Sequence, residues 1–260
     1  MLKGKTALVT GSTSGIGLGI AKALAGQGVH ILLNGFGDVD APRAEVLEAG
    51  KDFGVKVEFH GADMSRAAEI EDLFSYAQDK LGGIDIVVNN AGIQHVAAIE
   101  DFPTDRWDAI LAINLTSAFH TTRLALPRMK EKGWGRIINV ASVHGLVASA
   151  QKSAYVAAKH GLVGLTKVTA LETATTAITC NAICPGWVLT PLVQKQVDAK
   201  AAALGLSNEE ATRLLLGEKE PSMQFTTPEE LGDLAVFFCS PGANNVRGVA
   251  WNMDGGWTAQ

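Results

Sequence analysis

The chain has 260 residues, 47% of them hydrophobic, so it is long enough to bury a sizeable core in one large domain or two small ones. Its formal net charge of −5 at pH 7 gives no electrostatic reason to expect a nucleic acid or an anionic membrane as partner. No apolar run approaches the roughly 20 residues that span a bilayer, and Met1–Lys5 leave no room for a signal peptide before the first apolar run. We therefore expect a cytoplasmic protein, and in that reducing compartment we expect the cysteines to be reduced.

Apolar runs of strand length alternate with helical patterns along the whole chain, which is typical of a parallel, doubly wound sheet. The expected strands are residues 6–10, 29–34, 55–60, 84–88, 136–140, 178–183 and 248–252. The expected helices are residues 15–27, 40–53, 66–81, 104–131, 153–174, 191–216 and 228–239. The pattern predicts an α/β fold of Rossmann type: a seven-stranded parallel sheet with helices on both faces, in a single domain over residues 1–260.

A glycine-rich turn follows the first expected strand. Residues 10–17 read Thr-Gly-Ser-Thr-Ser-Gly-Ile-Gly, and a helical pattern follows directly. The glycines at 11, 15 and 17 allow a tight turn that brings backbone N–H groups close to a pyrophosphate, and the helix N-terminus adds its partial positive charge. The segment predicts a dinucleotide site, although its Gly-x-x-x-Gly-x-Gly spacing differs from the more common Gly-x-Gly-x-x-Gly.

The tip of the second strand usually distinguishes the two nicotinamide dinucleotides, through an acid for the NAD ribose or a cation for the NADP phosphate. Here the strand ends at Asn34, and the nearest acid is Asp38. Neither Arg nor Lys lies in residues 11–17 or 34–38, so we expect NAD, while some use of NADP stays open. Phe36 either packs against the adenosine or covers the edge of the sheet.

Tyr155 and Lys159 are four residues apart in Ala-rich sequence, so they share one face of an expected helix. A phenol has a reference pKa near ~10, and a neighbouring cation stabilises the phenolate and lowers that pKa. Ser142 follows the expected strand 136–140 and brings a hydroxyl to the same place. The three side chains predict acid–base chemistry at an alcohol or carbonyl oxygen, although a Tyr-x-x-x-Lys pair alone also fits an ordinary helix surface.

These motifs, with Asn89–Gly92, Asn114 and Pro185–Gly186, resemble the short-chain dehydrogenase/reductase family in order and approximate spacing over essentially the whole chain. The resemblance implies that Ser142, Tyr155 and Lys159 are catalytic and that Asn114 helps hold a water connecting the lysine to solvent. Asp63 is expected at the adenine, with a helix N-cap as its alternative role. The cofactor contacts implied are Gly11, Thr13, Ser14, Gly15, Ile16, Gly17, Phe36, Asp63, Asn90, Ala91, Gly92, Tyr155, Lys159, Pro185, Gly186, Val188 and Thr190.

Polar side chains that suit a small carboxylate lie near the catalytic set in the sequence: Gln94, His144, Lys152 and Gln196. Trp187 and Trp257 offer an apolar wall for a short alkyl group. Residues 89–95, 144–149, 183–188 and 254–257 further resemble bacterial D-3-hydroxybutyrate dehydrogenases. That resemblance implies a substrate site made by Gln94, Ser142, His144, Lys152, Tyr155, Trp187, Gln196 and Trp257, although each side chain alone also fits a structural or surface role.

We therefore expect reversible NAD-dependent oxidation of (R)-3-hydroxybutyrate to acetoacetate. The alternatives are a reductase for a bulkier ketone or a 3-oxoacyl thioester, and a non-catalytic sensor of the dinucleotide. Residues 190–220 are expected to form a helical lid over the substrate. Family resemblance also implies a homotetramer, built through residues 104–131 and 153–174 and the C-terminal strand. The histidines lack metal-ligand spacing, so no metal is expected.

Overall fold

The fold is described from a computed structural model, in which residues 2–259 are placed. Within these residues, seven strands form one parallel sheet in the order β3-β2-β1-β4-β5-β6-β7. The strands are β1 (Thr6–Val9), β2 (His30–Asn34), β3 (Val57–His60), β4 (Ile86–Asn89), β5 (Gly135–Val140), β6 (Ile178–Pro185) and β7 (Ala250–Met253). The helices are α1 (Gly15–Ala25), α2 (Asp40–Ala49), α3 (Ala67–Leu81), α4 (Thr104–Leu111), α5 (Ser117–Lys132), α6 (Ser153–Glu172), α7 (Pro191–Leu204), α8 (Asn208–Gly217) and α9 (Pro228–Cys239). The predicted fold class is confirmed.

The central strands are buried on both faces, which explains why they read as continuous apolar runs rather than as alternating patterns. In the sheet, Val9 pairs with Leu33 on one side and with Val88 on the other. The strand order therefore reverses between β1 and β4. In open α/β sheets this reversal opens a crevice at the carboxyl ends of the strands.

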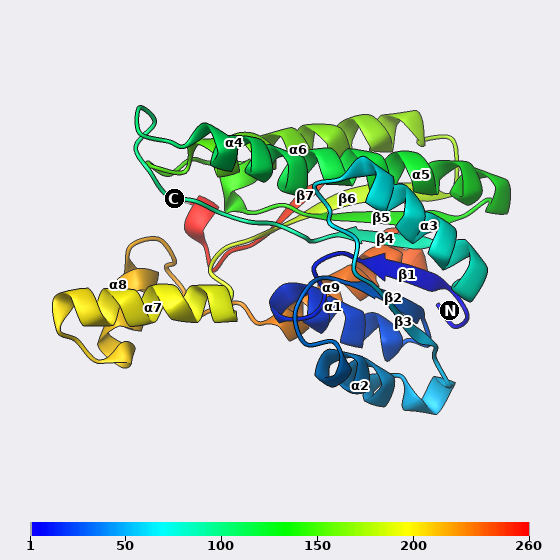
Figure 1. Cartoon of the computed structure of the whole chain (residues 1–260), viewed down its shortest axis with the longest axis horizontal. Helices are drawn as coiled ribbons and strands as arrows, with labels where there is room; N and C mark the ends of the chain where they lie inside the picture. Colours follow the sequence, from blue (N-terminus) through cyan, green and yellow to red (C-terminus); the bar gives the residue numbers. More distant parts are fainter. Residues whose placement is uncertain (1, 260) are drawn as a thin grey trace.

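Helices cover both faces of the sheet (Figure 1). On one face, α1, α2 and α9 bury Ile20, Leu24 and Phe238 against the sheet. On the other face, α3, α5 and α6 cover the sheet, with Leu73 and Met129 in the core. The pair α7 and α8 projects away from the carboxyl edge (Figure 1). No helix within residues 2–259 is both long and apolar enough to cross a lipid bilayer.

Three of the expected helices are interrupted or end four residues before the predicted residue, whereas the other helix ends agree with the prediction within two residues. The expected helix 191–216 is two helices, because Gly205 takes a left-handed conformation (φ 65°) and Ser207 then starts α8 with a capping box. The expected helix 104–131 contains a π-helical turn at Ala112–Thr116. The expected helix 40–53 ends at Ala49, and a separate 3₁₀ turn follows.

Candidate active site

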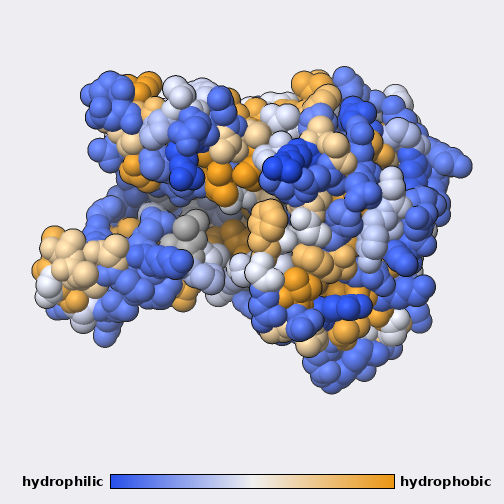
Figure 2. Space-filling model, viewed as in Figure 1, coloured by the Kyte–Doolittle hydropathy of each residue, from blue (hydrophilic) through white to orange (hydrophobic). Residues whose placement is uncertain are grey.

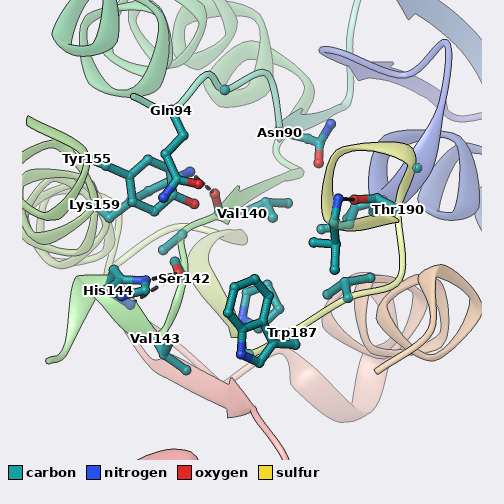
Figure 3. Close-up of a pocket in the computed structure, with 18 of the residues that line it drawn as sticks. Asn90, Gln94, Val140, Ser142, Val143, His144, Tyr155, Lys159, Trp187 and Thr190 are labelled. Carbon is teal, nitrogen blue, oxygen red and sulfur yellow. Dashed lines mark hydrogen bonds between the residues drawn. The ribbon is translucent and has the colours of Figure 1, made fainter. Parts of the chain in front are cut away.

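A cavity of about 310 Å³ lies at the carboxyl ends of β1, β4, β5 and β6. It is lined by the loops that follow these strands and by Pro191, Val193 and Gln196 of α7. Figure 2 shows the surface hollowed between the projecting α7–α8 pair and the body of the molecule. In the close-up, Gln94, Tyr155 and Lys159 lie on one side of the cavity, and Trp187 and Thr190 lie on the other (Figure 3).

The glycine-rich turn brings backbone into this cavity. Gly11 and Gly15 have φ of 60° and 55°, which other residues rarely adopt. A Cβ at Gly17 would lie 2.4 Å from the Gly11 carbonyl oxygen, so only glycine fits there. Ser14 begins α1 without capping it through its side chain, and Gly15 and Ile16 line the cavity. The first N–H groups of α1 are therefore suited to a phosphate group.

The Asn90–Gly92 segment holds this turn in place as well as lining the cavity. The Asn90 side chain donates hydrogen bonds to the carbonyl oxygens of Thr10 and Gly11, at 2.9 and 3.0 Å. The Thr10 hydroxyl in turn accepts from the N–H groups of Asn90 and Ala91. The carboxyl ends of β1 and β4 are thus locked together where a dinucleotide would cross.

Asn34, at the tip of β2, is buried and points into the protein. Its amide donates to the carbonyl oxygens of His60 and Ala62, each at 3.0 Å. Its amide oxygen accepts from the Gly11 N–H at 3.4 Å. A carboxylate cannot make the two donor contacts, so an Asn at this position has a structural reason.

Ser142, Tyr155 and Lys159 meet in the cavity, as the sequence predicts. The Lys159 ammonium is buried, donates to the Val140 carbonyl oxygen at 2.7 Å and lies 5.6 Å from the centroid of the Tyr155 ring. Burial lowers the pKa of Lys159 to about 8.

The predicted lowering of the Tyr155 pKa is wrong for this structure. Burial raises the pKa of Tyr155, and a hydrogen bond from Ser142 only opposes that rise. The physical reason is that the phenol is desolvated while the nearest ammonium is aimed at a backbone carbonyl.

Asn114 has the special environment that a polar residue in mid-helix requires. It is buried within the π-helical turn, and its amide group both accepts from the Ile93 N–H and donates to the Ile93 carbonyl oxygen, at 2.9 and 3.0 Å. Ile93 and Gly92 line the cavity, whereas Asn114 does not. Asn114 therefore holds the loop after β4 from the side that faces away from the cavity.

The residues predicted for the substrate all line the cavity: Gln94, Ser142, His144, Lys152, Tyr155, Trp187, Gln196 and Trp257. Among the described residues, the lining contains two lysines and no Asp or Glu. Burial lowers the pKa of Lys152. Burial also lowers the pKa of His144 to about 4, with the Lys152 charge contributing, so its ring is neutral at pH 7. An anion entering this cavity meets cations and neutral donors only.

The His144 ring joins the catalytic serine to the aromatic wall. Its Nδ1 lies 3.4 Å from the Ser142 hydroxyl and its Nε2 lies 2.9 Å from the Ser149 hydroxyl. The ring packs edge-on against Trp257, with centroids 5.5 Å apart. Trp257 is in turn 6.2 Å from Trp187. The two indoles form one apolar wall beside the serine.

Several predicted cofactor residues lie outside this cavity. Thr13 donates its hydroxyl to the Phe36 carbonyl oxygen at 3.0 Å, and the Phe36 ring is 71% exposed. Asp63 accepts from the N–H and hydroxyl of Ser65, and these bonds lower its pKa. Gly17 lies behind the turn, packed on Gly11. These residues lie at or beside the carboxyl ends of β1, β2 and β3.

Other lining residues were missed by the sequence reasoning: Ile93, Val140, Ala141, Val143, Pro191 and Val193. Val140 ends β5, and the carboxyl end of a strand in such a sheet is the general signal that would have identified it. The others are apolar residues beside the predicted polar ones, and no chemistry distinguishes them in the sequence.

Comparison with known proteins agrees with this geometry. The sequence model of the short chain dehydrogenase family matches residues 5–201. The D-beta-hydroxybutyrate dehydrogenase of Cupriavidus necator is 74% identical over 260 residues, covering all of both chains. The protein of that name from Rhizobium meliloti is 53% identical over 257 residues, covering 98% of this chain and 99% of its own. Among solved structures, L-sorbose reductase from Gluconobacter frateurii, complexed with NADPH and L-sorbose, superposes with a TM-score of 0.93 at 31% identity, covering 100% of this chain and 98% of its own.

Proposed function

The chain belongs to the short-chain dehydrogenase family, and from that premise we propose that it oxidises (R)-3-hydroxybutyrate to acetoacetate reversibly with NAD. The names of the relatives at 74% and 53% identity support this reaction. The observation that carries the proposal is the cavity itself, which combines Ser142, Tyr155 and Lys159 with Lys152, neutral donors and two tryptophans.

Several features fit a nicotinamide dinucleotide at this site. The close approach of Gly11 and Gly17, together with the uncapped start of α1, suits its pyrophosphate. Ala91, Gly92, Pro185, Gly186, Val188 and Thr190 would contact its nicotinamide half, and Phe36 and Asp63 its adenosine half. We assign NAD because no Arg or Lys lies in residues 11–17 or 34–38. When bound, NAD supplies the hydride acceptor and a positively charged ring beside Tyr155.

The catalytic step follows from the placement of three side chains. Tyr155, as phenolate, accepts the proton of the substrate hydroxyl, and the hydrogen on C3 leaves as hydride, so that a ketone forms. Ser142 orients the reacting oxygen. The hydrogen bond from Ser142 opposes the rise that burial imposes on the Tyr155 pKa, and the positive charge of bound NAD⁺ would oppose it further. By family resemblance we assign Asn114, whose side-chain amide is bound to the Ile93 backbone, to proton exchange between Lys159 and solvent through a water.

The substrate carboxylate is assigned to Lys152, with Gln94, His144 and Gln196 as further polar partners. Lys152 is the one lining cation, among the described residues, that the catalytic set does not use. Trp187 and Trp257 lie at the methyl end. Residues 190–220, with α7 and α8, act as a lid within a single domain over 1–260, and closure excludes water from the reaction.

We further propose a cytoplasmic homotetramer. Exposed apolar side chains lie on the elements that family resemblance assigns to subunit contacts: Phe119 on α5, Leu171 on α6 and Trp251 on β7 are 48%, 76% and 43% exposed. Such residues favour burial by a partner surface. The buried, free thiols of Cys180, Cys184 and Cys239 fit a reducing compartment.

The carboxylate assignment is tested by comparing free (R)-3-hydroxybutyrate with its methyl ester. Lys152→Ala is expected to lower kcat/KM for the acid by about 10–100-fold, because a buried charge-assisted contact is lost. Activity on the ester should change little. Lys80→Ala, an exposed lysine on α3, is the matched control and should leave both unchanged. Equal turnover of acid and ester by the unmodified enzyme would instead indicate a general ketone reductase.

A further inference from the structure

The α7–α8 segment leaves the sheet after β6 and returns to it near residue 220. Glu220 lies at this return and is only 1% exposed. Its Oε1 accepts a hydrogen bond from the Trp187 N–H, at the point where the segment leaves the sheet. Its Oε2 is buried and has no hydrogen-bond partner within the described residues. One carboxyl group therefore joins the two ends of the segment.

The surrounding backbone leaves room for this carboxyl group. A Cβ at Gly186 would lie 2.1 Å from Glu220 Oε1, and a Cβ at Gly255 would lie 3.4 Å from Glu220 Oε2. Gly255 also has a φ of 57°, which favours glycine at this position. Three segments thus meet at Glu220: the chain after β6, the return from α8, and the turn after β7.

The contact reaches the substrate cavity through Trp187. The Trp187 N–H is held by Glu220, and the Trp187 carbonyl oxygen accepts from the Thr226 N–H at 3.0 Å. Both backbone groups of Trp187 are therefore bound to the returning segment. Its ring lines the cavity beside Trp257 and lies 5.5 Å from the Lys152 ammonium.

The electrostatic surroundings of Glu220 make its charge costly. Burial, with a contribution from Asp254, raises the pKa of Glu220 to about 7, although the bond from Trp187 opposes the rise. The Asp254 carboxylate is bound to the Gly256 N–H and to Thr258. Two ammonium groups also lie near the indoles of this wall: Lys219, 6.0 Å from the Trp257 ring, and Lys152, 5.5 Å from the Trp187 ring. A buried carboxyl with one unpaired oxygen beside a substrate cavity is a feature typical of functional sites.

We propose that Glu220 is a positioning residue for substrate binding, which orients the Trp187 ring by holding its backbone N–H. The proposal rests on the proposed function, since it takes Trp187 as the wall at the methyl end of the substrate. Glu220 does not line the cavity, so it acts through Trp187 and not by touching substrate or cofactor. The ionised carboxylate makes the stronger bond, because hydrogen bonds to charged acceptors are stronger than those to neutral ones.

Steady-state kinetics at pH 8 tests the role through two Glu220 variants. Glu220→Ala removes the acceptor and is expected to raise KM for (R)-3-hydroxybutyrate about tenfold, the effect of one buried hydrogen bond, with KM for NAD within about twofold. Glu220→Gln keeps an acceptor oxygen and should restore most of the loss. Glu209→Ala and Glu209→Gln, on an exposed residue of α8, are the matched controls. If Glu220→Ala matches Glu209→Ala, or changes both KM values alike with a fall in Tm, the proposal is overturned.

A spectroscopic titration tests the same contact without turnover. The fluorescence of the enzyme minus that of Trp187→Phe isolates the Trp187 signal among the five tryptophans. This signal should show a transition near pH 7, following the pKa of Glu220, and Glu220→Gln should abolish it. Both proteins are titrated over the same range, so that the titration of Lys159, whose pKa is about 8, is common to the two curves. If the two curves do not differ near pH 7, the proposal is overturned. A protein that shows the transition but leaves hydroxybutyrate unoxidised would contradict the proposed function and not the Glu220 contact.

Discussion

Tyr155 and Lys159 share one buried environment, but their pKa values shift in opposite directions. Burial disfavours the charged form of each, so it raises the pKa of the phenol and lowers the pKa of the ammonium to about 8. The spacing in the sequence predicted that the two would meet, and they do. It could not predict the direction for Tyr155, because desolvation depends on how deeply the folded chain buries the phenol.

The raised pKa of Tyr155 predicts how the rate of oxidation depends on pH. The phenolate is the base for oxidation, and its fraction grows as pH rises toward a raised pKa, so kcat/KM for oxidation should increase from pH 6 to pH 9. Tyr155→Phe should lower kcat about 10²–10⁴-fold with Tm unchanged. The control is a primary isotope effect on C3, which establishes that chemistry limits the rate. A flat pH profile under that condition would contradict the role of Tyr155.

At the scale of elements, Asn34 at the tip of β2 connects neighbouring segments of the sheet by hydrogen bonds and is not available to recognise the cofactor. The Asn34 amide ties β2 to the end of β3 through His60 and Ala62 and to the glycine turn through Gly11. The sequence showed that the usual acid is absent here. The three partners that explain its absence come from other segments, so the sequence alone could not supply the reason.

Asn34→Asp tests this joint. The acid loses both donor contacts and places a buried carboxylate beside two carbonyl oxygens, so the free energy of unfolding at pH 7 should fall by about 2–4 kcal/mol. Urea denaturation measures the change, and KM for NAD should not improve. Asp38→Asn, on an exposed residue whose oxygen still can accept from the Asp40 N–H, is expected to change stability by less than about 0.5 kcal/mol. A stable Asn34→Asp variant with tighter NAD binding would show instead that this position recognises the ribose.

The α7–α8 pair shows where local signals were sufficient and where they were not. The capping box that starts α8 is a local signal, because Ser207 and Glu210 are three residues apart in the chain. The break at Gly205 was missed because an isolated glycine inside an apolar helical pattern does not by itself end a helix. The importance of Glu220 was also invisible, since its partners Trp187, Gly186 and Gly255 lie far from it in the chain.

At the scale of the molecule, the alternation of strands and helices was enough to predict the parallel sheet, because parallel strands require crossover helices. The order β3-β2-β1-β4-β5-β6-β7 then places the ends of β1, β4, β5 and β6 around one cavity. This is why motifs from residue 11 to residue 257 converge on a single site. What the pattern could not give was the depth of burial of each side chain, on which the pKa values depend.

The proposed reaction is tested by the initial rate with (R)- and (S)-3-hydroxybutyrate, each with NAD⁺ and with NADP⁺. The R acid should reduce NAD⁺ rapidly, and kcat/KM for the S acid should be at least about 100-fold lower. Only one enantiomer presents C3–H to the nicotinamide while its carboxylate contacts Lys152. Use of NADP⁺ should be weak, since no cation is available near Asn34. Equal rates for the two enantiomers, or a preference for NADP⁺, would show that the chain does not catalyse the proposed reaction.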